Sequence, residues 1–241
     1  MKNLTRMVVF ALIAFSTVSA FAQKKEKKFT GTVTYSIESV GETPMPIHEN
    51  EETVKLLDER LSMNNGLLLI NGRTVYQVMD LSQIQMYASQ LGIGEDYTGP
   101  WKAYLKSELT QSSIDSLPLI ESYKIEYLDE TKEIAGVTAK KAKIIVKNED
   151  TDEITEREVW YAENMGPEYD LVFVHFLKGF PLEFTRNIGN GMVIKMTAKE
   201  IAKKKLKDAE FLLPAGHDEM TPEQFQEIQE MIQEIQDSLG N

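Results

Sequence analysis

The chain has 241 residues and a formal net charge of −12, from 26 basic and 38 acidic side chains. Such an acidic chain repels a phosphate backbone, so nucleic acid is not expected as a partner. There is no cysteine, which excludes disulfides, thiolate metal ligands and a lipidated N-terminal cysteine.

The first residues have the pattern of a cleavable export signal. Lys2 and Arg6 precede an apolar run, Met7–Ala20, and Ala20-Phe21-Ala22 is a small-x-small cleavage site. The run is shorter than the roughly 20 residues that span a bilayer, which favours cleavage over anchoring. We therefore expect a signal peptide over 1–22 and no membrane span after cleavage.

A flexible leader is expected over 23–28, because it carries no apolar side chain. A single domain is expected over 29–241, since a chain of this size can bury a sufficient core without disulfides. Export without cysteine is typical of the periplasm or outer cell envelope of a Gram-negative-type bacterium. We expect the protein to reside there without a lipid anchor.

The first half of the domain reads as a meander of strands. Residues 29–37 alternate apolar and hydroxyl side chains, and a second strand is predicted from Thr53 to Met63. Two further strands, Leu67–Ile70 and Thr74–Met79, flank Asn71-Gly72, a strong hairpin signal.

The segment 81–119 has a different periodicity. Apolar side chains recur every three or four residues, which is typical of amphipathic helices. The first predicted helix carries Ile84, Tyr87 and Leu91, and Ser82 can cap it. The second carries Trp101, Tyr104, Leu105 and Leu109. We expect this insertion to form a helical lid.

Strands resume after the insertion. The alternation predicts strands over Tyr123–Leu128, Val137–Lys147, Ile154–Ala162, Leu182–Asn187 and Met192–Ala198, with turns at 134–136, 148–152 and 190–191. Residues 199–209 fit either a strand or a helix, and we favour an edge strand.

A C-terminal helix is predicted over 221–239. Thr221 is its N-cap, Pro222 its first residue, and Gln224 completes a capping box. One stripe is apolar, comprising Phe225, Ile228, Ile232, Ile235 and Leu239. Docking on the protein's own sheet is favoured, and the alternative is a partner helix.

The sequence shows no constellation of catalytic residues. His48, His175 and His217 are isolated from one another and no metal-ligand spacing occurs. His175 lies in the apolar run 171–177, where a buried core histidine is the favoured interpretation. We therefore expect a non-enzymatic protein with no metal and no cofactor.

Aromatic and methionine side chains are the remaining signal. They concentrate in the predicted lid and in 173–184, where they suit either an apolar pocket or ordinary helix-on-sheet packing. The candidate ligand-binding residues are Ile84, Tyr87, Leu91, Trp101, Tyr104 and Leu105 in the lid, with Phe173, Phe176 and Phe180 as the floor.

Several short motifs resemble the GLPGLI and DUF4412 type of secreted envelope proteins. They are Ile134-Ala135-Gly136-Val137, Val159-Trp160-Tyr161-Ala162, Gly179-Phe180-Pro181 and the tail Phe211-Leu212-Leu213-Pro214-Ala215-Gly216. Leu182-Glu183 stands where the name-giving motif has another glycine. The resemblance implies a LolA-like half-barrel around an apolar concavity, and it implies no catalytic residues.

Together these observations predict a mainly β (α+β) fold, with a curved antiparallel half-barrel sheet, an inserted helical lid and a C-terminal amphipathic helix. The leading hypothesis is a binding protein for an apolar or amphiphilic, lipid-like ligand. The alternative is a structural or interaction module that engages another envelope protein through its C-terminal helix or a sheet edge.

Overall fold

We analysed a computed structural model of the chain. The structure describes residues 28–40, 50–63, 66–115, 123–147, 154–187 and 193–239. The predicted signal peptide, the leader up to residue 27, His48 and the turns at 148–152 and 190–191 lie outside these described residues.

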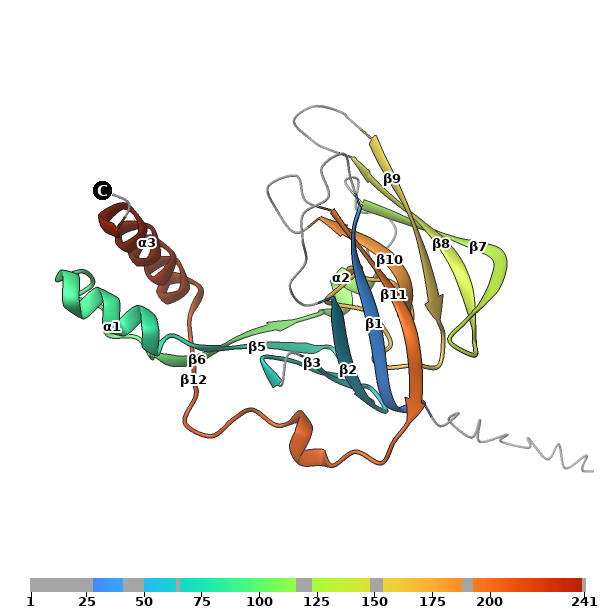
Figure 1. The fold of residues 1–241 in the computed structure, drawn as a ribbon, viewed down its shortest axis with the longest axis horizontal. Coiled ribbons are helices and arrows are strands. Elements are labelled where there is room, and N and C mark those ends of the chain that lie inside the picture. Colours follow the sequence, from blue (N-terminus) through green and yellow to red (C-terminus); the bar gives the residue numbers. More distant parts are fainter. Residues whose placement is uncertain are drawn as a thin grey trace, which may run out of the picture.

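The protein is mainly β, as predicted, and its strands form one open, mostly antiparallel sheet (Figure 1). The strands are β1 (Thr30–Val40), β2 (Glu51–Leu57), β3 (Arg60–Met63), β4 (Leu68–Asn71), β5 (Thr74–Asp80), β6 (Lys102–Glu108), β7 (Tyr123–Ile134), β8 (Val137–Lys147), β9 (Ile154–Ala162), β10 (Phe180–Asn187), β11 (Val193–Lys203) and β12 (Asp218–Glu219). The helices are α1 (Ser82–Leu91), α2 (Gln111–Asp115) and α3 (Pro222–Leu239), and a 3₁₀ turn, η2, covers Asp208–Phe211.

The sheet consists of two meanders that meet at β1. Its strand order is β12-β6-β5-β4-β3-β2-β1-β11-β10-β9-β8-β7. The chain therefore moves outward from β1 to β6, then starts again at the opposite edge with β7 and returns to β1 through β11. Among the described strands, the short pairing of β12 with β6 is the one parallel pair.

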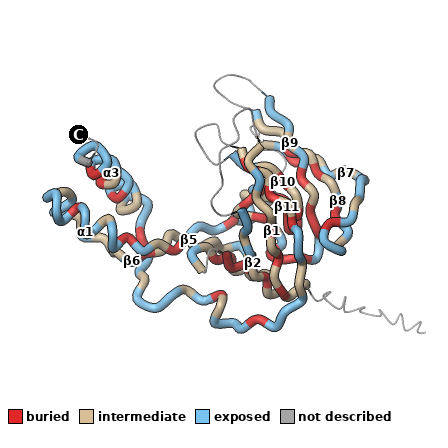
Figure 2. Tube along the Cα trace, in the orientation of Figure 1, coloured by how far each residue is buried: buried red, intermediate tan, exposed pale blue. Residues whose placement is uncertain are grey.

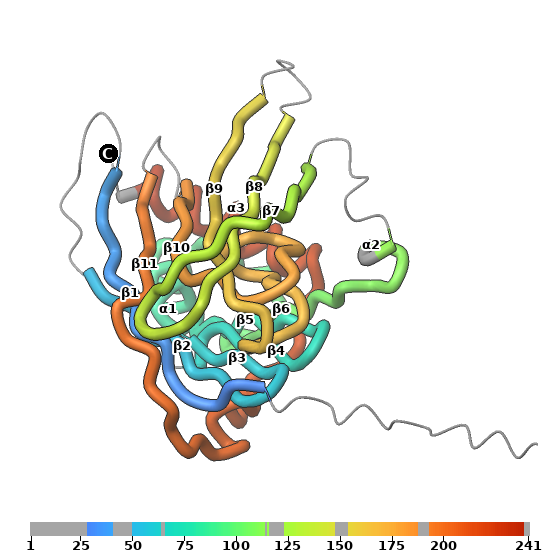
Figure 3. The backbone as a smooth tube through the Cα atoms, turned by 90° about the vertical axis from the view of Figure 1, so that its right-hand side faces the viewer, coloured from blue at the N-terminus to red at the C-terminus, as the bar shows by residue number. Residues whose placement is uncertain are grey.

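The larger hydrophobic core lies inside the bend of the sheet. Residues 163–179, which connect β9 to β10, fold into this bend (Figure 3). Phe173 from this connection packs against Tyr35, with 5.8 Å between the ring centroids, and against Phe184 at 5.2 Å. The protein thus fills much of its own concavity with aromatic side chains.

A smaller, second core lies at the other end of the molecule, where α1 and α3 pack together at the end of the β5–β6 hairpin (Figures 1 and 2). Its buried members are Leu81, Ala88, Ala103, Met220, Ile228, Met231 and Ile235. The predicted apolar stripe of the C-terminal helix is thereby used within the chain: Ile228 is 1% exposed and Ile235 5%.

The capping box predicted for the C-terminal helix is confirmed. The backbone N–H of Gln224 donates to Thr221 Oγ1 at 3.2 Å, and the N–H of Thr221 donates to Gln224 Oε1 at 3.0 Å. The predicted cap of α1 is wrong, because Ser82 is already helical. Asp80 Oδ1 instead accepts hydrogen bonds from the backbone and hydroxyl of Ser82.

The predicted second lid helix is wrong. Residues 102–108 form strand β6, which pairs along its whole length with β5. The single remaining lid helix, α1, packs against α3 and not over the concavity filled by 163–179. The spacing of three and four residues wrongly predicted a helix, because apolar side chains lie on both faces of the paired strands β5 and β6.

Two strand predictions also need correction. Thr53–Met63 is two strands, β2 and β3, since Asp58 turns the chain with a positive φ of 54°. The predicted strand over 199–209 ends at Lys203 and is followed by η2. This strand, β11, lies between β1 and β10 and is not an edge.

His175 is exposed, so the prediction of a core histidine is wrong. Its neighbours Val174 and Leu177 turn inward while the connection around it forms irregular turns. Among the described residues, no helix is both long and apolar enough to cross a membrane.

Candidate ligand-binding groove

An apolar groove separates the two cores. Its volume is about 720 Å³, within the range of small-molecule sites. It is lined by Met63, Leu67, Leu68, Val75, Gln77, Val78, Leu105, Lys106, Ser107, Leu171, Val172, Arg186, Pro222 and Phe225. Ten of these fourteen residues are apolar, both charged ones are basic, and no lining residue among those described is acidic.

The floor of the groove is one face of the β4–β5–β6 ladder. Val75 pairs with Ser107, and Gln77 pairs with both Leu68 and Leu105. Cross-strand partners point to the same side of a sheet, so these side chains form adjacent rows on a single face. Leu67, which precedes β4, adds a leucine that is 50% exposed.

The wall on the side of the larger core comes from the 163–179 connection. Asp170 organises it, because its carboxylate accepts backbone hydrogen bonds from Val172, Phe173 and Val174 at 3.0, 3.2 and 2.5 Å. These bonds hold Val172 in the groove wall while Phe173 points into the core. Burial raises the pKa of Asp170 to about 6, although the three N–H donors and the charge of Arg186 oppose that rise.

The opposite wall is the first turn of α3. Pro222 and Phe225 line it, directly after the capping box that fixes where the helix begins. The backbone N–H of Met220 donates to the carbonyl of Tyr104 at 2.9 Å, and β12 pairs with β6. The ladder that forms the floor therefore also anchors this wall.

A smaller basic pocket of about 330 Å³ adjoins the groove, and the two share Val172 and Arg186 as lining residues. Its charged and titratable members include Arg157, Arg186, His175 and Glu158. Desolvation of the ring and the positive charge of Arg186 lower the pKa of His175, although its side chain remains accessible to solvent.

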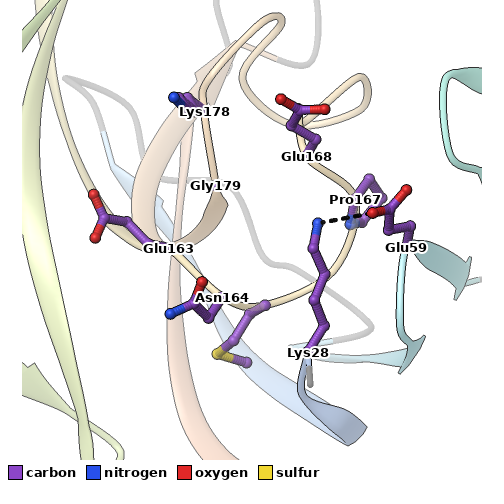
Figure 4. Close-up of a pocket in the computed structure, with 9 residues that line it drawn as sticks. Lys28, Glu59, Glu163, Asn164, Pro167, Glu168, Lys178 and Gly179 are labelled. Carbon is purple, nitrogen blue, oxygen red and sulfur yellow. Dashed lines mark ion pairs between the residues drawn. The ribbon is translucent and has the colours of Figure 1, made fainter. Parts of the chain in front are cut away.

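A third pocket, of about 430 Å³, is highly charged (Figure 4). Lys28 crosses it, donating to the carbonyl of Gly166 at 3.2 Å and pairing with Glu59 at 3.6 Å. Glu163, Glu168 and Lys178 also line it. These contacts join the start of β1 to the 163–179 connection, which is a structural role, so the apolar groove is the better candidate site.

The structure does not bring the predicted ligand-binding residues together in one site. Among them only Leu105 lines the groove, and Phe173 lines the adjoining basic pocket. Ile84 and Trp101 pack against the second core, Tyr104 is half-buried on β6, and Tyr87 and Leu91 on α1 are 40% and 41% exposed. Phe180 is 2% exposed within the larger core, and the half-buried Phe176 packs against that core with a positive φ of 65°.

Sequence reasoning missed most of the groove. Leu67, Leu68 and Val75 read as an ordinary hairpin, because nothing local indicates that its face remains uncovered. Arg186 could have been identified from the sequence, because it continues the alternate row of Phe180, Leu182 and Phe184, all of which are buried. A cation at the end of an inward-facing apolar row is expected where the core meets solvent.

The described residues contain no group of three or more His, Asp or Glu side chains that could hold a metal ion. No protein-family model matches the chain, and no curated protein matches its sequence.

Proposed function

We propose that the protein is an exported, non-enzymatic envelope protein that binds an apolar or amphiphilic, lipid-like ligand in the groove between its two cores. The observation that carries this proposal is the composition of the groove: it has a volume of about 720 Å³, and none of its described lining residues is acidic in a chain of net charge −12. Large uncovered apolar surfaces in soluble proteins usually mark binding sites.

The open sheet and the resemblance to the GLPGLI and DUF4412 type add support, because both are compatible with a LolA-like half-barrel. In the proposed arrangement the ligand lies beside the filled concavity and not within it, since Phe173 and Phe180 already occupy the bend of the sheet. The β4–β5–β6 ladder then takes the role that we expected of a helical lid.

The alternative proposal is an interaction module for another envelope protein. The apolar stripe of α3 offers a protein partner little surface, because Ile228, Met231 and Ile235 are buried in the second core. The outer side of α1 is a better candidate surface for a protein partner, since Met86, Tyr87 and Leu91 are all at least 40% exposed there. A protein partner bound at α1 would leave the groove free.

Binding of the neutral fluorescent probe N-phenyl-1-naphthylamine tests the groove. Leu67→Gln removes an exposed leucine from the floor of the groove. Leu212→Gln is a matched control, because Leu212 is 63% exposed and lies outside the groove. We expect Leu67→Gln to weaken binding about fivefold, equivalent to roughly 1 kcal/mol of apolar contact.

Leu212→Gln should leave the dissociation constant unchanged. No saturable binding to the unmodified protein, or equal weakening by the two variants, would contradict the proposal. If the probe binds as expected, native mass spectrometry of the protein purified from its own envelope would identify a co-purifying ligand.

A further inference from the structure

The groove and the basic pocket together suit a ligand with two chemically distinct ends. Arg186 lines both, and Val172 forms the boundary between them. One side of this boundary offers a largely apolar floor, in which Gln77 lies between Leu105 and Leu68. The other side offers two arginines within a pocket of about 330 Å³.

Both arginines reach the pocket from rows of inward-facing side chains. Arg157 continues the alternate row of Val159 and Tyr161 on β9, and Arg186 continues that of Leu182 and Phe184 on β10. The other members of each row are buried, so each arginine lies where the core ends and solvent begins. This placement lets the aliphatic stems pack on apolar surface while the guanidinium groups remain available.

The positive charge in this pocket is only partly offset, because the charges of Arg186 and Asp170 interact and Glu158 also lines the pocket. Within the part of the chain that the structure describes, neither arginine forms an ion pair or a hydrogen bond with another residue. Glu158 is the pocket's acidic member, and its Oε1 is paired with Lys141 Nζ at 2.8 Å. Asp170, buried nearby, directs both carboxylate oxygens to three backbone N–H groups.

We propose that Arg157 and Arg186 bind the anionic head group of an amphiphile whose apolar chain lies in the groove. A carboxylate or a phosphate would satisfy both guanidinium groups, because each accepts charge-assisted hydrogen bonds from arginine. His175 lies at the edge of the same pocket, where its ring already donates to the backbone carbonyl of Leu171. The inference rests on the proposed function and specifies its ligand class, an anionic amphiphile such as a fatty acid or an acidic lipid.

The test compares two probes with the same chain and different heads, oleate and oleyl alcohol, each below the concentration at which it aggregates. Oleate should bind the full chain at least about tenfold more tightly, the value of one good charge-assisted hydrogen bond. Arg186→Gln and Arg157→Gln should each reduce oleate affinity and leave that of oleyl alcohol unchanged.

Lys205→Gln is the matched control, because it removes the same charge from an exposed lysine that lines none of the three pockets described above. Circular dichroism and thermal melting verify that each variant is folded. Inorganic phosphate distinguishes a lipid head group from a free anion: displacement of oleate by phosphate at equal concentration would show a site for free anions and overturn the proposal.

The remaining outcomes are also decisive. If oleyl alcohol binds as tightly as oleate, or if Arg186→Gln weakens both equally, the head-group inference fails while the apolar groove survives. If neither probe binds the unmodified protein, the proposed function itself fails. Selective loss of oleate binding in the two arginine variants, with Lys205→Gln unaffected, supports the inference.

Discussion

Replacing Ile228 with alanine tests whether the two cores unfold separately. Ile228 is 1% exposed and is one of the seven buried side chains that the described residues contribute to the second core. Truncating a buried isoleucine to alanine costs about 2–5 kcal/mol, whereas a whole domain is stable by only about 5–15 kcal/mol. Because the second core is small, we expect the substitution to remove most of its local stability.

Hydrogen exchange measured by mass spectrometry resolves the effect along the chain. Amides of α1 and α3 should exchange faster in Ile228→Ala by a factor matching the lost free energy, while those of β1 and β11 keep their protection. Gln229→Ala, on the exposed side of the same helix, should leave all four elements unchanged. Faster exchange in β1 equal to that in α3 would refute the reasoning, because the two cores would then unfold as one.

Two further predictions concern the larger core. Tyr35→Phe should lower the free energy of unfolding by about 1–3 kcal/mol, since the buried Tyr35 hydroxyl donates to the carbonyl of Pro181 at 2.5 Å. Urea denaturation measures this, and an equal loss in Tyr76→Phe, which removes a hydroxyl from a half-buried tyrosine of β5, would contradict it. Asp170 has a pKa raised from 3.8 to about 6, so its stabilising contribution is complete below about pH 4 and is lost as the pH rises through about 6. Relative to Asp170→Asn, the unmodified protein should lose up to about 3 kcal/mol between pH 4 and 7, and parallel pH profiles of the two would contradict this.

Strands with one buried face were predictable from the sequence. The bounds of β8 and β9 agree with the prediction, because alternation and strong turns such as Ala135-Gly136 define both ends. The C-terminal helix was equally clear, since its cap and its stripe give the same limits. In these elements local preference and tertiary packing point to the same structure.

The helical insertion was mispredicted where two cores share one hairpin. Trp101 and Leu105 contact the second core, while Tyr104 packs edge-on against Tyr76, with 5.9 Å between the ring centroids. Apolar groups on both faces of a strand abolish its period of two and can imitate a helical spacing. Only the pairing of β6 with β5, a tertiary feature, determines the outcome.

The same shared hairpin explains why a groove exists at all. Met79 and Ala103 pair across β5 and β6 beneath the second core, while Val75 packs against the larger core. Between these ends the same face continues through Gln77, Leu105 and Leu68, and among the described helices only the first turn of α3 borders it. A continuous ladder that enters two separate cores must cross the space between them, so its middle rows stay accessible unless a further element covers them. The site therefore arises from the spacing of the two cores along one hairpin, which no local sequence pattern encodes.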